Sequence, residues 1–160
     1  NNDVLSELNT LFSQGIEFVE PADLSGSIRG RHNLYAHLET MVKRAEKSVT
    51  IMTTSKGVLR KVEALQPILT KLSKKGVKIK IAAPNEETAN DQIKDIKKFA
   101  TMKGIDNPNA RFCIVDGKEI MFMVMDDKDV HPTYDLGIWV NAPYFAGALE
   151  NLFGLVWDKC

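Results

Sequence analysis

The sequence predicts an α/β domain, with a mixed, mostly parallel sheet that is covered by helices on both faces. Three observations support this fold class. Short strands rich in β-branched residues alternate with amphipathic helices, which favours parallel strand pairs. One strong hairpin adds antiparallel strands, and helices on both faces would bury the sheet. With 160 residues and 44% hydrophobic content, the chain is large enough for one such core.

The first segment is predicted to be a short helix that ends at Gly15. A helix of about a dozen residues is marginal alone, so this one either packs on the domain or ends a longer helix. Residues 16–19 are expected to form a short strand and residues 21–26 a loop. The apolar positions of the helix include Leu5, Leu8, Leu11 and Phe12.

Between residues 31 and 76 the chain is predicted to form a helix, a strand and a second helical segment. Apolar residues at helical spacing indicate an amphipathic helix over residues 31–47, and residues 48–53 are typical of a buried strand. A second helical pattern extends from Val58 to Leu72 and ends at Gly76. Pro67 interrupts that pattern, so we expect either a kink or two helices.

The remaining elements follow from alternation, turn residues and helical spacing. Residues 77–82 alternate as a strand does, and residues 86–99 are expected to form a charged helix. Asp-Gly between two apolar runs favours a type I′ hairpin. The hairpin strands are residues 111–115 and 119–125, a further strand covers 136–140, and the last helix runs from Pro143 to Trp157.

Composition excludes several classes of function. Lys plus Arg and Asp plus Glu are 21 each, so no net field attracts DNA or an acidic membrane. The two cysteines and three histidines lack metal-site spacing, and no glycine-rich phosphate loop is present. No membrane span or signal segment is found, so we expect a cytoplasmic protein without metal, cofactor or membrane partner. Because the chain opens on Asn1 rather than Met, it is expected to be a fragment.

One loop has the residue types of an anion site. Thr54, Ser55 and Lys56 follow a predicted strand and precede a predicted helix, where hydroxyl and backbone N–H groups can hold an anion. The same residues suit an ordinary helix N-cap formed by Thr54 or Ser55. Both interpretations remain open from the sequence.

Several stretches of the chain together resemble the C-terminal domain of TrmB-type transcriptional regulators. The resemblance covers the chain from about Ser27 and includes the amphipathic helix and the strand after it; its other stretches are Ile28-Arg-Gly, Gly76-Val-Lys-Ile-Lys-Ile and Ala110-Arg-Phe-Cys-Ile-Val-Asp-Gly. It implies a phospholipase D-like half-domain from a mainly archaeal family. In that family a winged helix and a dimerising helix precede the domain. Residues 1–14 would then be the end of the dimerising helix, with Leu5, Leu8, Leu11 and Phe12 at the dimer contact, and residues 15–160 the regulatory domain.

The resemblance also implies that catalysis has been lost. Catalytic phospholipase D enzymes carry the hairpin motif His-x-Lys-x-x-x-x-Asp, in which the histidine takes the phosphoryl group and the lysine stabilises its charge. Counting back from Asp116 places Asn109 at the histidine position and Arg111 at the lysine position. An asparagine cannot act as that nucleophile, so we expect no enzyme activity. Arg111 has two open interpretations, a ligand contact in the old cleft and a structural salt bridge.

The sequence therefore predicts a non-catalytic domain that senses an effector and dimerises, within a regulator that contacts DNA only through a domain missing from this chain. The effector would be a sugar or an anion. A degenerate phosphodiesterase and a purely structural assembly domain are the alternatives. The expected ligand residues are Thr54, Ser55, Lys56, Asn109, Arg111 and Asp116.

Overall fold

The computed structural model describes residues 4–6, 24–88 and 91–160. Leu5 lies in a helical turn and is exposed. The predicted contact residues Leu8, Leu11 and Phe12 and the predicted strand over residues 16–19 lie outside the described part of the chain. Dimerisation through the first segment therefore stays a prediction.

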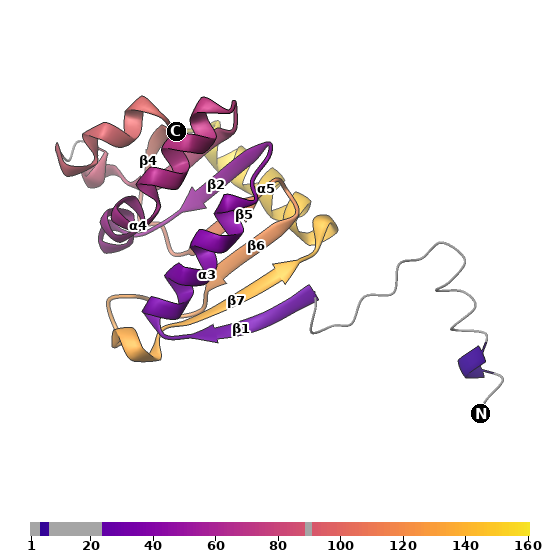
Figure 1. Cartoon of the computed structure of the whole chain (residues 1–160). Helices are drawn as coiled ribbons and strands as arrows, with labels where there is room; N and C mark the ends of the chain where they lie inside the picture. Colours follow the sequence, from indigo (N-terminus) through magenta and orange to yellow (C-terminus); the bar gives the residue numbers. More distant parts are fainter. Residues whose placement is uncertain (1–3, 7–23, 89–90) are drawn as a thin grey trace.

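A seven-stranded sheet forms the centre of the domain (Figure 1). Its strands lie in the order β1-β7-β6-β5-β2-β3-β4, so β1 and β4 are the edges. The strands are β1 (Ser25–Arg29), β2 (Ser48–Met52), β3 (Lys78–Pro84), β4 (Thr101–Ile105), β5 (Arg111–Val115), β6 (Glu119–Met123) and β7 (Leu136–Asn141).

The prediction of a mostly parallel sheet is wrong. Only the pairs β2–β3 and β3–β4 are parallel, whereas β1–β7, β7–β6, β6–β5 and β5–β2 are antiparallel. The reason is that the hairpin β5–β6 continues directly into β7 without a crossover helix. Strand β1 then pairs antiparallel with β7 and extends this half of the sheet.

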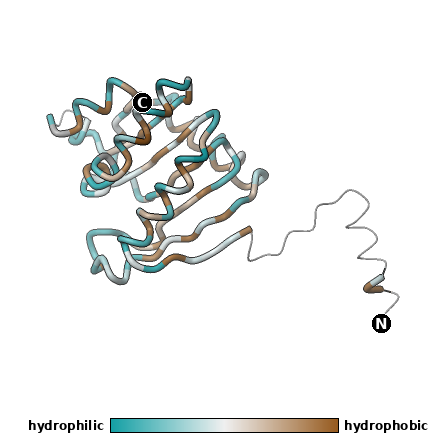
Figure 2. The backbone as a smooth tube through the Cα atoms, in the orientation of Figure 1, coloured by the Kyte–Doolittle hydropathy of each residue, from teal (hydrophilic) through white to brown (hydrophobic). Residues whose placement is uncertain are grey.

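Helices cover both faces of the sheet, as predicted. Helices α3 (Arg31–Lys43) and α4 (Ser55–Lys74) cover one face, and α5 (Pro143–Trp157) lies on the other (Figure 1). Successive side chains of β5 point to opposite faces of the sheet: Cys113 packs toward α3 and α4, whereas Ile114 packs toward α5. Figure 2 shows hydrophobic and hydrophilic residues interleaved along the strands and helices. None of the described helices is long and apolar enough to span a membrane.

The predicted helices differ from the observed ones in two places. Helix α4 continues through Pro67 as one element, so the expected division into two helices does not occur. The charged helix expected over residues 86–99 is instead two 3₁₀ segments, η1 (Asn85–Glu87) and η2 (Asp91–Lys98). A third 3₁₀ segment, η3 (Pro132–Tyr134), precedes β7.

Strands β1 and β4 were not predicted, because both contain residues that are uncommon in strands. Strand β1 reads Ser-Gly-Ser-Ile-Arg, and β4 reads Thr-Met-Lys-Gly-Ile. Gly104 has a specific role in β4, since a Cβ there would come within 2.3 Å of Asn85 Oδ1. Both strands are edge strands, where neighbouring strands determine pairing more than local propensity does.

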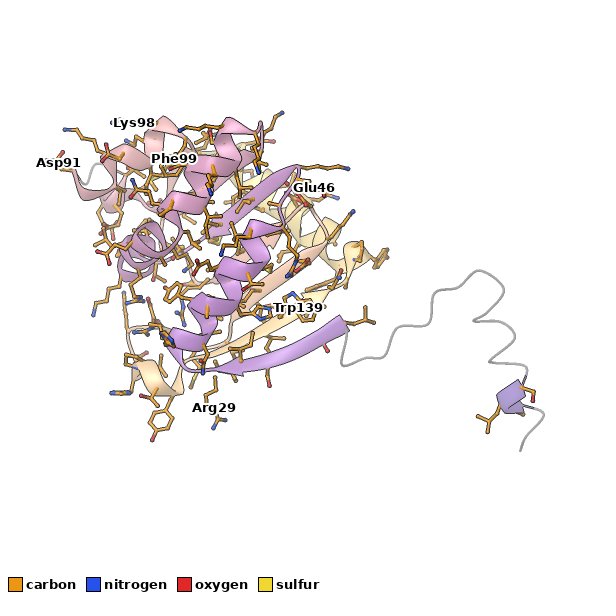
Figure 3. The ribbon with its side chains drawn as sticks, viewed as in Figure 1. Arg29, Glu46, Asp91, Lys98, Phe99 and Trp139 are labelled. Carbon is orange, nitrogen blue, oxygen red and sulfur yellow. The ribbon has the colours of Figure 1, made fainter. Side chains whose placement is uncertain are left out.

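The two tryptophans differ in how deeply they are buried. Trp157 is buried among the residues under α5, and its ring stacks on Phe153. Trp139 is partly buried between β7 and α3 (Figure 3), where its ring meets that of His37 at 5.6 Å between centroids. The indole N–H of Trp139 also donates to Glu119 Oε2 at 3.0 Å. Both tryptophan rings therefore contribute to packing, and that of Trp139 is also held by a hydrogen bond.

The hairpin turn has the predicted geometry. Asp116 and Gly117 both have positive φ, 56° and 64°, as a type I′ turn requires. The Asp116 carboxylate accepts hydrogen bonds from the N–H groups of Glu46, Lys47 and Ser48 at 2.7–3.1 Å. Partial burial would raise the pKa of Asp116, but these N–H groups and the charge of Lys118 lower it. Asp116 thus fixes the start of β2.

Replacing Asp116 with alanine is expected to destabilise the fold by about 1–3 kcal/mol, because three backbone N–H groups lose their acceptor. Denaturation in urea at neutral pH measures the loss. Asp116→Asn is the matched control, since asparagine tolerates positive φ and keeps one acceptor oxygen. An alanine variant as stable as the original protein would contradict the assigned role.

Candidate functional site

A pocket of about 450 Å³ opens at one end of the sheet. The parallel strands β2 and β3 end there, and β5 begins there because it pairs antiparallel with β2. Strand β6 ends at the same edge and continues into residues 124–135, which we call the β6–β7 loop. The lining residues are Thr54, Ser55, Pro84, Glu86, Asn107, Pro108, Asn109, Ala110, Arg111, Met123, Val124, Met125, Asp126 and Lys128.

The structure brings four of the six predicted ligand residues together. Thr54, Ser55, Asn109 and Arg111 all line the pocket, although they come from two distant parts of the chain. Lys56 is exposed in the first turn of α4 and is not among the lining residues. Asp116 lies at the opposite end of β5, in the hairpin turn, so it does not reach the pocket.

Thr54 is the N-cap of α4, which was one of the two interpretations of this loop. Its hydroxyl accepts a hydrogen bond from the Gly57 N–H at 3.2 Å and donates one to Asp127 Oδ2 at 2.7 Å. The neighbouring Ser55 hydroxyl donates to Glu86 Oε1 at 3.3 Å. Both hydroxyls therefore have protein partners on the pocket wall.

Arg111 is committed to an ion pair inside the protein. Its side chain is 3% exposed, and its two terminal nitrogens donate to the two oxygens of Asp135 at 2.9 and 3.1 Å. The guanidinium also donates to the carbonyl oxygen of Met125. Asp135 accepts a further bond from Arg31 Nε at 3.2 Å. Of the two interpretations of Arg111, the structure therefore supports the salt bridge.

The β6–β7 loop is held by a second buried carboxylate. Asp127 Oδ2 lies 2.5 Å from Arg60 Nη2, and the Asp127 side chain is completely buried. Burial would raise the pKa of Asp127, but the Thr54 hydroxyl and the charges of Arg111 and Arg60 lower it. Burial acts on Asp135 in the same way, and the Arg111 and Arg31 contacts lower its pKa. Both carboxylates are thus stabilised in their charged form.

A lysine is buried beneath the pocket. Lys61 is 3% exposed, and its Nζ donates to the Thr53 hydroxyl at 3.0 Å. Burial, reinforced by the positive charge of Arg111, lowers the pKa of Lys61 from 10.5 to about 7. Gly57 allows this contact, since a Cβ there would come within 2.4 Å of Thr53 Oγ1.

Sequence reasoning missed these buried charges, although one of them left a visible pattern. Lys61 falls between Val58 and Leu65 on the apolar stripe of α4, so its position alone indicates burial. Asp127 and Asp135 lie in the loop between two predicted strands, and their arginine partners are 67 and 24 residues away. No local pattern identifies such pairs.

The charges of the pocket wall nearly cancel. Glu86 and Asp126 contribute two negative charges, Lys128 and Arg111 contribute two positive charges, and Arg111 shares the buried Asp135 with Arg31. The amides of Asn107 and Asn109 supply neutral donors and acceptors. Across the described residues, no three His, Cys, Asp or Glu side chains are grouped to hold a metal ion. The arrangement suits a neutral ligand with several hydroxyl groups better than an anion.

Comparison with known proteins gives a match to one family model over most of the chain. A family model described as transcriptional regulator TrmB, EBD N-terminal subdomain, matches residues 27–159. A search of curated proteins gives no match.

Solved structures share the fold. TrmBL2, described as an archaeal chromatin protein with a novel mode of DNA binding, superposes with a TM-score of 0.68 at 19% identity. The match covers 99% of this chain and 60% of TrmBL2, so the chain spans about three fifths of that protein.

Two further solved structures of the same architecture also match. NucT from Helicobacter pylori has a TM-score of 0.65 at 12% identity, over 85% of this chain and 96% of NucT. Nuc from Salmonella typhimurium, a phospholipase D family member, has a TM-score of 0.62 at 13% identity, over 84% of this chain and 95% of Nuc. These likenesses concern the fold, and they confirm the phospholipase D-like architecture.

The burial of Lys61 can be tested through the pH dependence of stability. Between about pH 7 and 10.5 only the unfolded chain keeps the Lys61 proton, so stability should rise with pH in this window, by up to about 1.4 kcal/mol per unit. Urea denaturation from pH 6.5 to 8.5 measures the slope, and Lys61→Met should flatten it. This range avoids the opposing effect of Cys113, whose thiol pKa burial raises from 9.0 to about 12.

Lys71→Met is the control, because Lys71 is an exposed lysine of the same helix. It should keep the slope of the original protein. Equal slopes in the Lys61 variant and the original protein would mean that Lys61 is solvated.

Proposed function

This chain belongs to the TrmB family of transcriptional regulators, and on that premise we propose that its pocket binds a neutral, polyhydroxylated small molecule, such as a sugar, without transforming it. The domain would act as the effector-sensing part of a homodimeric, cytoplasmic regulator. DNA contact would belong to another part of a longer protein.

The commitment of Arg111 to Asp135 carries this proposal. A phosphoryl or carboxylate ligand would need a cation with free donor groups, and both terminal nitrogens of Arg111 already donate to Asp135. Glu86 and Asp126 on the pocket wall would repel an anion. The hydroxyl groups of a neutral ligand, in contrast, can donate to these carboxylates and accept from the asparagine amides.

A volume of about 450 Å³ supports a ligand of this class, because small-molecule pockets usually range from about 300 to 1,000 Å³. Met123, Val124 and Met125 supply an apolar side to the otherwise polar wall. Sugar rings present apolar C–H faces between their hydroxyls, so a mixed wall suits them.

A phosphodiesterase is the second candidate, since Nuc, a phospholipase D family member, shares the fold. Asn109 argues against it, because an amide cannot take up a phosphoryl group as a histidine does. We therefore propose binding without turnover.

A thermal shift screen tests the proposal. Among the neutral mono- and disaccharides screened, at least one should raise the melting temperature of the protein, because binding to the folded state stabilises it by mass action. Phosphate and citrate should give no shift. Asn109→Ala should weaken the sugar about fivefold or more, the equivalent of one hydrogen bond of about 1 kcal/mol.

Two controls separate the alternatives. Lys56→Ala changes a residue of the first turn of α4 that lies outside the pocket, so it should leave the affinity for the sugar unchanged. Glu86→Gln should strengthen an anionic ligand and weaken or leave unchanged a neutral one. Stabilisation by anions alone, or hydrolysis of a phosphodiester that Asn109→Ala abolishes, would contradict the proposed function.

A further inference from the structure

The two faces of the sheet are covered unequally. Helices α3 and α4 and segment η2 pack on one face, whereas α5 is the one described helix on the other (Figure 1). Phe122 and Ile138, on the α5 side of the sheet, remain only partly buried. In the described part of the chain this hydrophobic layer is therefore covered incompletely.

Helix α5 itself carries an apolar stripe on its outer side, which we call the α5 stripe. Its members are exposed although each is aromatic or aliphatic, with Tyr144 at 95%, Leu155 at 64% and Leu152 at 60%. The inner face of the helix is already used by Ala146, Phe153 and Trp157. The α5 stripe consists of Tyr144, Phe145, Ala148, Leu152, Leu155 and Val156.

The spacing of the stripe is that of a helix–helix contact. Phe145, Ala148, Leu152 and Leu155 follow one another at intervals of three, four and three residues, the pattern of a seam that packs against another helix. A helix with apolar residues on its inner and outer sides is expected to be buried on both. Among the residues that the structure describes, nothing covers its outer side.

The area and charge of the stripe fit a second copy of this chain. At usual side-chain areas its members expose on the order of 600 Å² together, near the roughly 800 Å² per partner of a standard interface. Among the stripe residues none is charged, so two copies would meet without repulsion. Asn151 is exposed at the edge of the stripe, and its amide can both donate and accept hydrogen bonds with its copy.

We propose that the α5 stripe is the homodimer contact of this domain, with α5 of one copy packed on α5 of the other. The proposal rests on the homodimer in the proposed function and assigns its surface. The pocket lies at the edge formed by the ends of β2, β3 and β6, so both pockets of the dimer would stay open. Assembly and ligand binding would thus use separate surfaces.

Sedimentation velocity of the whole chain, over about a hundredfold range of concentration, tests this assignment. A reducing agent keeps the exposed Cys160 from forming a disulfide between copies. The original chain should approach twice the monomer mass. Leu152→Asp and Leu155→Asp should each raise the dissociation constant at least about thirtyfold, since each substitution enters the symmetric contact twice.

Tyr134→Asp is the matched control, because Tyr134 is 66% exposed and lies outside α5. It should dimerise as the original chain does. Added salt should leave the association unchanged or strengthen it, since no ion pairs are involved. Circular dichroism and melting curves of the α5 variants should match those of a folded monomer.

The outcomes separate this inference from the proposed function. Dimers that persist in both α5 variants and dissolve on deletion of residues 1–14 would overturn the α5 contact and leave the homodimer intact. A chain that stays monomeric throughout would overturn both the contact and the homodimer. Ligand binding by the pocket is measured separately, by thermal shift on the Leu152→Asp variant, and should be retained.

Discussion

A guanidinium that is only 3% exposed needs a compensating charge, and in this domain Asp135 supplies it to Arg111 in a two-bond contact. Asp135 also binds Arg31 at the start of α3, and its carbonyl accepts from the N–H of Gly30. One buried carboxylate therefore joins β5, the end of the β6–β7 loop and the β1–α3 turn. Removing one partner of such a pair leaves a buried charge unpaired.

The ion pair also determines what the neighbouring pocket can bind. The β6–β7 loop supplies Met125, Asp126 and Lys128 to the wall, and Arg111 and Asp127 hold this loop in place. A cation that neutralises an internal aspartate is not available to a phosphate. The contact that holds the pocket wall in place therefore also supports the proposal that the pocket binds a neutral ligand.

The sequence predicts most helices and central strands because these depend on local periodicity. Helical spacing predicts α5 with its observed ends, and the turn residues Asp116 and Gly117 predict the hairpin between β5 and β6. The sheet was expected to be mostly parallel, but β5, β6 and β7 follow one another without a crossover helix and β5 pairs antiparallel with the distant β2. The same limit applies to the site: Asn109 and Arg111 were located by the hairpin motif, whereas Asp127 and Asp135 take their roles from distant arginines.

A double-mutant cycle on the unfolding free energy tests the central claim most directly. It compares Arg111→Met, Asp135→Asn and the double variant with the original chain. If the pair is structural, each single substitution should be costly and the coupling energy should be at least about 2 kcal/mol. A coupling energy near zero would mean that Arg111 is free to meet a ligand, and the argument for a neutral effector would fail.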